Sequence, residues 1–281
     1  MSESLAIRRT AIAAAGVLVW LGSAHGAHAG YVMGVFDTSR ASTTNIASGT
    51  VNEEARQAFL TNFAGAAYAT SPTLTPEFLN GVDMVAVCST DTEDAGISPL
   101  SASEQTALFE FVQGGGTAFL IAEGFTPHLA AAQSIVAPFG VTIEDDGMSD
   151  ILVAAPTNPA HPIFDGPFGV APPIPILGTG IFTDLGPYAT PLARLQIGRQ
   201  PALAVIEAGV IAPGSGRVVI IGDGSPFVDT ADGGFSRYTE TMLLNTLAYL
   251  APVPEPSGRV LGGMAVAGLV AVVRTRRCRR V

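Results

Sequence analysis

The sequence predicts an α/β fold in which a doubly wound, mostly parallel sheet is covered by helices on both faces. Between residues 31 and 140, short apolar runs alternate with amphipathic segments of helical length. Strands of a parallel sheet are buried on both faces and need helical crossovers, so this alternation is what they leave in a sequence. The pattern returns after residue 216, whereas residues 151–213 are rich in proline and glycine. That composition predicts hairpins and long loops.

The first β-α unit begins at the apolar run 31–36, which ends in Asp37. This run predicts a buried strand followed by a turn. The pattern Thr50-x-x-Glu53 matches a capping box, so a helix is expected to begin there. The apolar residues expected on its buried face are Phe59, Leu60 and Phe63.

A second unit begins with the apolar run 82–87, which predicts a buried strand ending at Cys88. The pattern Ser101-x-x-Glu104 is another capping box and predicts the start of a helix. Three consecutive glycines at 114–116 should end that helix. The apolar residues expected on its buried face, spaced i, i+3 and i+4, are Leu108, Phe111 and Val112.

The remaining elements lie on either side of the proline-rich region. Residues 117–122 predict a third strand, and residues 126–138 predict a helix. Residues 217–221 predict a further buried strand, and residues 238–250 a closing amphipathic helix. The region 151–213 between them is expected to be irregular and β-rich. It would either extend the sheet or form a small insertion.

The first 29 residues have the features of a secretory signal peptide. Arg8 and Arg9 precede an uncharged run at 11–21, and Ala-His-Ala at 27–29 gives an A-x-A cleavage pattern before Gly30. The protein is therefore expected to be exported. Removal of this leader, and of the C-terminal segment described next, would leave an α/β domain at residues 30–252.

The C-terminal segment, 253–281, combines a motif, an apolar run and a basic end in that order. Residues 260–273 carry no charge, and a full membrane span needs about 20 apolar residues, so the run is short for one. A chain end this basic belongs in water or against anionic lipid, which disfavours a core helix. The motif is Val253, Pro254, Glu255 and Pro256, and the arginines at 274–280 are Arg274, Arg276, Arg277, Arg279 and Arg280.

This order of features resembles the PEP-CTERM sorting signal of exported bacterial proteins. The resemblance implies a precursor that is held at the inner membrane through 260–273 and processed by an exosortase. The implied partners are the export machinery, the exosortase and an exopolysaccharide-rich matrix. The implied destination is the periplasm, the outer envelope or the extracellular matrix.

Removing both end segments changes the charge of the chain. The whole chain has a net charge of −10, and residues 30–252 hold six arginines against 22 acidic residues, a net of −16. A surface this acidic repels nucleic acid and anionic membranes, so both are disfavoured as partners of the domain. Cys278 lies in the basic tail, so Cys88 would be the single cysteine of the domain, and no disulfide would form within it.

Several stretches resemble class I glutamine-amidotransferase-like domains. They are Asn-Gly-Val-Asp-Met-Val-Ala-Val at 80–87, Leu-Ser at 100–101, Phe-Val-x-Gly-Gly at 111–115 and Gly-Arg-Val-Val-Ile-Ile-Gly-Asp at 216–223. The resemblance covers about residues 30–250. It implies a flavodoxin-like sheet and a place among the noncatalytic branches of that superfamily, which occur in gliding-motility-type transport accessory proteins and in exported proteins.

The resemblance fails at the residue that carries the chemistry of the family. An active member needs a cysteine on the sharp turn after a central strand, with a histidine as base. The corresponding turn here reads Ala-Glu-Gly-Phe at 122–125, so Glu123 stands in place of the nucleophile. A carboxylate cannot replace a thiolate in glutamine hydrolysis. The chain is therefore expected to lack amidotransferase activity.

Three residues are candidates for other catalytic chemistry: Cys88, His161 and Glu123. Cys88 follows a predicted strand, at the edge where doubly wound folds gather ligand groups. Its alternative role is that of a small buried hydrophobe. His161 lies in a turn, Asn-Pro-Ala-His-Pro, where a structural hydrogen bond is the alternative to a role as base. His128, in the first turn of a predicted helix, is expected to be exposed.

Three acidic residues are candidates for a cation site. Asp37, Glu123 and Asp223 each follow a predicted strand, and parallel strands end at a common edge of their sheet. The alternative is that such residues cap helices or solvate loops. The sequence holds no P-loop, zinc spacing or dinucleotide fingerprint, so no cofactor is predicted.

Two classes of function remain open from the sequence. The first is an exported, exosortase-processed protein whose domain is a noncatalytic binding or structural module, and the missing nucleophile favours it. The second is a hydrolase-like enzyme that uses Cys88 with a histidine, or an acidic cation site at the strand ends. The geometry around Cys88, Glu123 and His161 decides between them.

Overall fold

A computed structural model describes residues 31–251, apart from 93–94, 146–149, 155–157, 177–179 and 228–236. The predicted leader, 1–29, and the predicted sorting segment, 253–281, lie outside the described residues. Within the described part of the chain, no helix is both long enough and apolar enough to cross a membrane.

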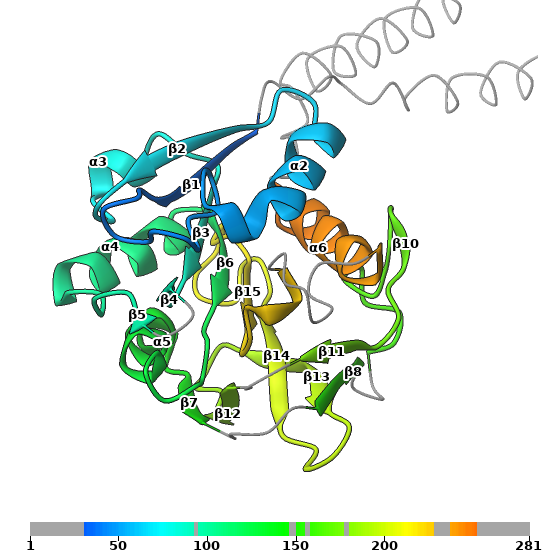
Figure 1. Cartoon of the computed structure of the whole chain (residues 1–281). Coiled ribbons are helices and arrows are strands. Elements are labelled where there is room, and N and C mark those ends of the chain that lie inside the picture. The colour runs from blue at the N-terminus through cyan, green and yellow to red at the C-terminus, as the bar shows by residue number, and fades with distance from the viewer. Residues whose placement is uncertain are drawn as a thin grey trace, which may run out of the picture.

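A nine-stranded sheet forms the centre of the domain, with the order β11-β8-β13-β14-β15-β6-β3-β1-β2 (Figure 1). One half is parallel, from β15 to β2, and the other half is antiparallel, from β11 to β14, which joins β15. The parallel strands are β2 (Ala67–Ser71), β1 (Val32–Phe36), β3 (Met84–Cys88), β6 (Thr117–Ile121) and β15 (Val218–Ile221). The antiparallel strands are β14 (Pro201–Ile206), β13 (Thr190–Leu195), β8 (Asp150–Ala154) and β11 (Ile174–Ile176).

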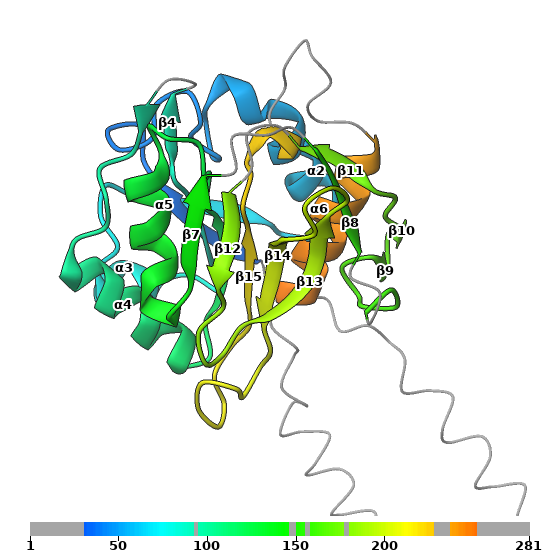
Figure 2. The ribbon, with the colours of Figure 1, turned by 90° about the horizontal axis from the view of Figure 1, so that it is seen from below.

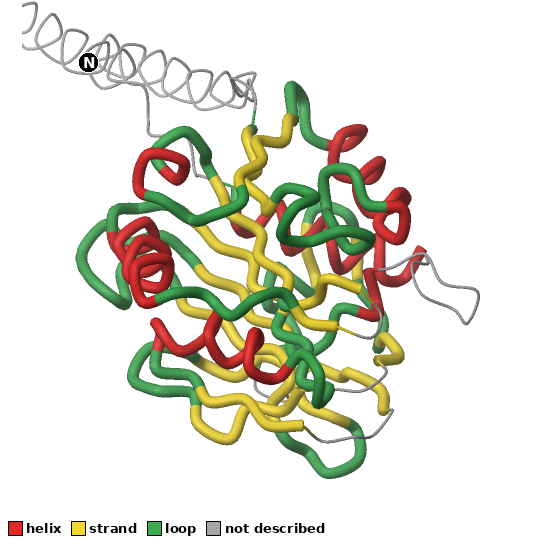
Figure 3. The backbone as a smooth tube through the Cα atoms, turned by 60° about the vertical axis from the view of Figure 1, so that its left-hand side comes forward, coloured by secondary structure: helices red, strands yellow, loops and turns green. Residues whose placement is uncertain are grey.

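Helices cover both faces of this sheet, as Figures 2 and 3 show from two further directions. One face is covered by α2 (Glu53–Asn62) and α6 (Arg237–Leu250), which pack against one hydrophobic cluster. The other face is covered by α4 (Ala102–Gln113) and α5 (Leu129–Val136), and the short helix α3 (Pro76–Leu79) packs there beside α4. The fold therefore has three layers, with the sheet in the middle.

Strand β6 shows why the buried strands read as continuous apolar runs. Phe119 and Ile121 belong to the cluster under α2 and α6, whereas Ala118 and Leu120 belong to the cluster under α4 and α5. Successive side chains of a strand point to opposite faces, and both faces of this strand are covered. All five residues of β6 are consequently buried.

Small elements complete the fold around the main sheet. Three two-stranded pairs are β7 (Thr142–Asp145) with β12 (Gly180–Asp184), β9 (Asp165–Gly166) with β10 (Gly169–Val170), and β4 (Thr90–Thr92) with β5 (Ala95–Gly96). Three 3-10 helices are η1 (Thr50–Asn52), η2 (Ala137–Phe139) and η3 (Ser225–Phe227).

Most predicted elements are present, and the predicted doubly wound α/β class is confirmed as an α/β fold with a mostly parallel central region. The strands at 31–36, 82–87, 117–122 and 217–221 correspond to β1, β3, β6 and β15 within two residues. The capping box at Ser101 is formed, with Glu104 as its partner. The proline-rich region extends the sheet, because β8, β11, β13 and β14 form its antiparallel half.

Two predictions about the first half of the domain are wrong. Thr50 begins a 3-10 helix and does not cap α2, because the residue that precedes α2 is Asn52. The Asn52 amide donates to the Thr44 carbonyl at 2.9 Å, so it holds the preceding loop. Leu60, expected on the buried face of this helix, is 40% exposed. The unit formed by β2 and α3, between β1 and β3, was not predicted at all.

Candidate functional site

The candidate site lies at the edge of the sheet where the parallel strands β3, β6 and β15 end. Cys88 is in register with Ile121, and Ile121 is in register with Ile221, so the three strands end level with one another. Glu123 and Asp223 each stand two residues beyond this level. Because side chains two residues apart point to the same face, the two carboxyl groups are brought together on neighbouring strands.

Glu123 is turned into the protein and held by its neighbours. Its backbone N–H donates to Ser89 Oγ at 2.7 Å, and its Oε2 accepts a hydrogen bond from the Gly224 N–H at 3.0 Å. The carboxyl group of Asp223 is among the neighbours that act on its ionisation. Glu123 is 8% exposed and Asp223 is fully buried. This side chain therefore lies inside the edge of the sheet and is not presented to solvent.

Burial and the neighbouring acid both favour the neutral form of Glu123. Burial raises the pKa of this carboxyl group well above its usual value, and the Asp223 carboxylate raises it further. The hydrogen bond from Gly224 works in the opposite direction but is outweighed. An ionised Glu123 would carry a second negative charge into a site that already holds an acid.

Close backbone contacts explain why the residue after Glu123 is a glycine. A Cβ added to Gly124 would lie 2.0 Å from the Cα of Gly180, and one added to Gly222 would lie 1.9 Å from the Gly180 carbonyl oxygen. The turn after β6 therefore packs directly on the backbone at the start of β12. Gly124 is needed for this close approach, which no sequence signal indicated.

Cys88 lies at the same edge as Glu123. Its Sγ is 3.2 Å from Thr90 Oγ1, and the side chain is partly buried. Burial raises the pKa of the Cys88 thiol; the hydrogen bonds to Thr90 oppose this, while Glu123 and Asp223 add to it. The surroundings therefore favour the neutral thiol, whereas a nucleophilic cysteine requires the thiolate.

His161 lies at the opposite end of the parallel strands from Cys88. Its Nε2 is 3.4 Å from Oε1 of Glu207, which follows Ile206, the last residue of β14. Ile206 is in register with Val218, the first residue of β15, whereas Cys88 is level with the last. His161 therefore does not pair with Cys88 as the hydrolase-like alternative would require of it.

The contacts of His161 give it a structural role. Its Nδ1 accepts a hydrogen bond from the Ile163 N–H at 3.3 Å, which places the proton of the neutral ring on Nε2. Its ring packs edge-on against Tyr249 at 4.9 Å, and the Tyr249 hydroxyl donates to Glu207 Oε2 at 2.7 Å. Burial lowers the pKa of His161, although Glu207 acts in the opposite direction. The hydrogen-bonded alternative for this residue is the one that the geometry supports.

His128 and Asp37 also differ from their expected roles. His128 is 2% exposed and packs beside Phe125, so the expectation that it is exposed is wrong. The Asp37 carboxylate accepts hydrogen bonds from the N–H of Ser39 at 2.9 Å and from its Oγ at 2.6 Å. Among the described residues, no three His, Cys, Asp or Glu side chains are grouped so that they could hold a metal ion. The candidate cation site of Asp37, Glu123 and Asp223 is therefore not assembled there.

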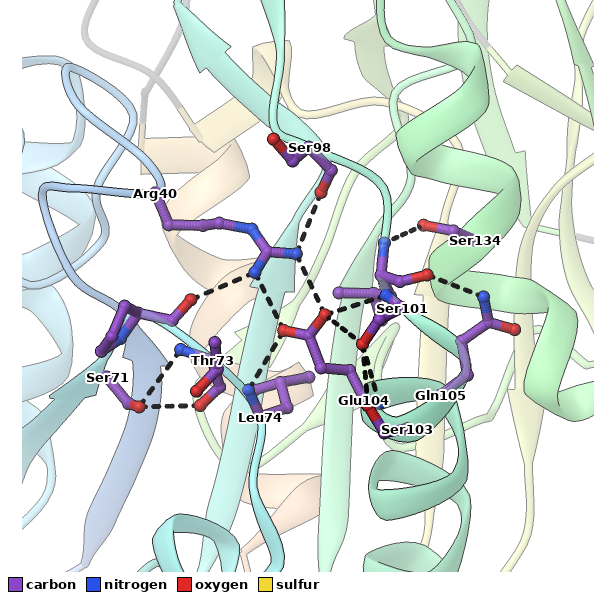
Figure 4. Close-up of polar contacts among 12 residues, drawn as sticks. Arg40, Ser71, Thr73, Leu74, Ser98, Ser101, Ser103, Glu104, Gln105 and Ser134 are labelled. Atoms are coloured by element: carbon purple, nitrogen blue, oxygen red, sulfur yellow. Dashed lines mark hydrogen bonds and ion pairs between the residues drawn. The ribbon is translucent and has the colours of Figure 1, made fainter.

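A buried ion pair that the sequence did not indicate lies near the ends of β1 and β2 (Figure 4). Arg40 Nη1 is 2.9 Å from Glu104 Oε1, and the two side chains are 13% and 9% exposed. The guanidinium also donates to the carbonyls of Pro72 at 3.1 Å and Ser98 at 3.0 Å, and it lies over the Phe36 ring at 4.6 Å. Arg40 thereby fastens three loops to one another.

Glu104 connects this ion pair to the start of α4. Its carboxylate accepts hydrogen bonds from the N–H of Ser101 at 2.9 Å and the N–H of Leu74 at 3.3 Å. Burial alone would raise the pKa of Glu104, but the hydrogen bonds from Arg40 and Ser101 outweigh it and lower that pKa. The arrangement stabilises the ionised carboxylate and has the character of a structural anchor.

The comparisons with known proteins establish the fold. No protein-family profile matches the sequence, and no curated protein matches it either. The solved mmIFT52 N-terminal domain is similar over 80% of this chain and 99% of its own, with a TM-score of 0.53 and 14% identity. The cytoplasmic protein STM3548 from Salmonella typhimurium is similar over 79% of this chain and 100% of its own, with a TM-score of 0.52 and 14% identity.

A solved glutamine amidotransferase is also similar, over 79% of this chain and 99% of its own, at 14% identity. Its TM-score of 0.39 is too low to support an argument about activity. The comparisons thus show an α/β fold with a distant likeness to known domains. What the site can do follows from its own residues, namely an inward-turned glutamate, a neutral thiol and a histidine at the opposite edge.

Proposed function

We propose that this chain is an exported, exosortase-processed envelope or extracellular-matrix protein whose α/β domain is a noncatalytic binding or structural module. The observation that carries the noncatalytic part is the position of Glu123. Glu123 is 8% exposed, and its carboxyl group accepts a hydrogen bond from the Gly224 N–H at 3.0 Å. The position that a nucleophile would occupy is thus filled by an acid that serves the packing of the turn.

The surroundings of Cys88 and His161 weigh against the hydrolase alternative. A cysteine nucleophile needs a lowered pKa or an adjacent base to supply the thiolate. The pKa of Cys88 is raised, first by burial and also by Glu123 and Asp223. The candidate base, His161, is paired with Glu207 at the opposite end of the parallel strands. These observations favour the module over the enzyme.

The order of features at the two chain ends supports export and sorting. A basic and apolar leader ending in Ala-His-Ala stands at 1–29, and the motif, apolar run and arginines stand at 253–281. Intact-mass analysis of the protein isolated from the cell envelope tests this part. We expect a chain that begins at Gly30 and lacks the arginines at 274–280. Protein isolated from the cell envelope that still ends at Val281 would contradict the sorting proposal.

The exopolysaccharide-rich matrix is the partner that the sorting proposal offers. We expect the processed protein to cosediment with exopolysaccharide from the cells that produce it. The matched control is the same protein denatured and alkylated, which keeps the net charge but not the surface of the fold. If native and denatured protein cosediment equally, the folded domain is not what binds, and the binding part of the proposal fails.

A further inference from the structure

Strand β2 forms an open edge of the main sheet. It is the outermost strand in the sheet order, and β1 is the strand that pairs with it (Figure 1). We propose that β2 is the contact surface of a homodimer, in which it pairs antiparallel with β2 of a second copy across a twofold axis at Ala69. The inference goes beyond the proposed function, because it depends on neither the ligand of the domain nor the absence of catalysis.

The bonds to β1 show which residues of β2 are already paired. The Ala67 N–H donates to the Tyr31 carbonyl at 3.0 Å, and the Ser71 carbonyl accepts from the Asp37 N–H at 3.0 Å. The register between the two strands runs unbroken through these positions. Because alternate residues of a strand bond to the same neighbour, the backbone groups of Ala67, Ala69 and Ser71 face β1.

The backbone groups of Tyr68 and Thr70 point the other way, out of the sheet. In the described part of the chain no further strand lies on that side of β2. Thr70 is exposed and Tyr68 is half-buried. The N–H and C=O groups of these two residues are therefore open to a strand from another molecule, which is the way that sheets grow at an edge.

The sequence of β2 lacks the devices that block such pairing. Edge strands are commonly protected by charged side chains, by proline within the strand or by bulges. Strand β2 reads Ala-Tyr-Ala-Thr-Ser and pairs with β1 without a register shift. Residues 57–76 hold no charged side chain, although residues 30–252 carry a net charge of −16. This neutral stretch is where two copies approach each other with little repulsion.

The spacing of the open residues makes β2 complementary to itself. Two copies related by a twofold axis through Ala69 place Tyr68 of each copy opposite Thr70 of the other. Such opposed residues exchange both of their N–H···O=C bonds, so every open group finds a partner in one register. Ala69 then meets its own copy as a non-hydrogen-bonded pair, with Cα atoms about 4.5 Å apart. A methyl side chain suits this close approach.

The twofold arrangement also preserves the layers of the fold. Tyr68 packs edge-on against Phe59 of α2 at 5.2 Å, so the side chains of Tyr68 and Thr70 lie on the α2 face of the sheet. An axis perpendicular to the sheet keeps α2 on the same face in both copies. Arg56 of α2 is paired with Glu53, so it brings no unbalanced charge to this face.

Sedimentation velocity of the processed protein over a range of concentrations tests the proposal. We expect an equilibrium between monomer and dimer. Added salt should shift it towards the dimer, because salt screens the repulsion between two chains of like charge. A protein that is monomeric at every concentration and salt level would overturn the proposal.

The deciding variant is Thr70→Pro. Proline removes one open N–H and places its ring at the edge, while the N–H groups that bond to β1 are kept. We expect this variant to stay monomeric where wild type is dimeric, with a wild-type urea midpoint under dilute conditions. The matched control, Thr70→Val, keeps the N–H and should dimerise like wild type. A dimer that survives Thr70→Pro would overturn the assignment to β2.

A cross-link decides the question if Thr70→Pro does not fold. In the proposed dimer the two copies of Ala69→Cys have Cα atoms about 4.5 Å apart, within the range of a disulfide. The matched control is Thr70→Cys, whose Cα atoms would lie about 8 Å apart, beyond that range. Cys88 is common to both variants. Mild oxidation should link Ala69→Cys and leave Thr70→Cys unlinked, whereas equal cross-linking of the two, or none in either, would overturn the proposal.

Discussion

Cys88 and His161 lie at opposite ends of the parallel strands. Cys88 is level with Ile221, the last residue of β15. His161 contacts Glu207, which follows Ile206, and Ile206 is paired with Val218, the first residue of β15. The three residue steps between these levels correspond to about 10 Å along a strand. A general base must reach the proton that it removes within hydrogen-bond distance, so His161 cannot serve Cys88 in this fold.

The reactivity of Cys88 should be low in the folded protein. Burial and the two neighbouring acids raise the pKa of its thiol, which reduces the thiolate at neutral pH. A smaller thiolate fraction reacts more slowly, so alkylation by iodoacetamide at pH 7 should be slower in the folded protein than in urea. The variant Cys278→Ser leaves Cys88 as the single thiol to be measured. Faster alkylation of the folded than of the unfolded chain would contradict the description of this site.

The Arg40 and Glu104 pair should be costly to break from either side. Because both side chains are largely buried, removal of one leaves a charge without its partner, at a cost of about 3–5 kcal/mol in the free energy of unfolding. Urea unfolding of Arg40→Ala and Glu104→Ala measures this cost. The control is Arg56→Ala, whose partner Glu53 is 53% exposed, with an expected loss of about 1 kcal/mol or less.

A double-mutant cycle tests whether the two residues act through each other. The loss in the double variant should be smaller than the sum of the two single losses, because the second substitution removes the charge that the first one left unpaired. Additive losses would show that Arg40 and Glu104 stabilise the fold independently of each other.

The stability contributed by Glu104 should disappear in acid. Its pKa in the folded protein is lowered, because the hydrogen bonds from Arg40 and Ser101 outweigh burial. That stability is therefore present above the ordinary value of 4.5 and is lost as pH falls through the folded-state pKa. Urea midpoints measured from about pH 6 to about pH 3 should fall less steeply for Glu104→Gln than for wild type. Glu110→Gln, at an exposed position of the same helix, should keep the wild-type slope.

Gly124 should not tolerate even a methyl group. A Cβ there would lie 2.0 Å from the Cα of Gly180, which is backbone and cannot turn aside. Gly124→Ala should cost about 3 kcal/mol or more, at the upper end of what overpacking costs. At Gly81 the nearest atom would be 3.4 Å away, so Gly81→Ala is the matched control and should unfold close to wild type. Similar urea midpoints for the two variants would show that the turn after β6 is not closely packed.

The parallel half of the sheet was predictable because its strands leave an unambiguous pattern. Strands β3, β6 and β15 are buried on both faces and therefore read as unbroken apolar runs. Strand β2 is the edge strand, and its sequence, Ala-Tyr-Ala-Thr-Ser, is only partly buried. An edge strand needs no continuous apolar run, which is why residues 67–71 carried no comparable signal.

The part of the site that depends on the parallel strands alone was predictable from the sequence. The common edge of Cys88, Glu123 and Asp223 follows from parallel strands, and the equal offset of the two acids from Ile121 and Ile221 makes them neighbours on adjacent strands. The place of His161 depends on the antiparallel half of the sheet, whose order the sequence left open. The ion pair of Arg40 and Glu104 joins residues 64 positions apart, and no local pattern indicates it.

A turnover assay tests most directly whether the domain is noncatalytic. Processed wild-type protein and Cys88→Ser should be compared for ammonia release from glutamine and for hydrolysis of an activated ester. Because the Cys88 thiol is held neutral and the candidate base His161 is paired with Glu207 at the other end of the strands, we expect neither protein to exceed the background rate. Turnover by wild type that is lost in Cys88→Ser, with an unchanged urea midpoint, would contradict the proposal.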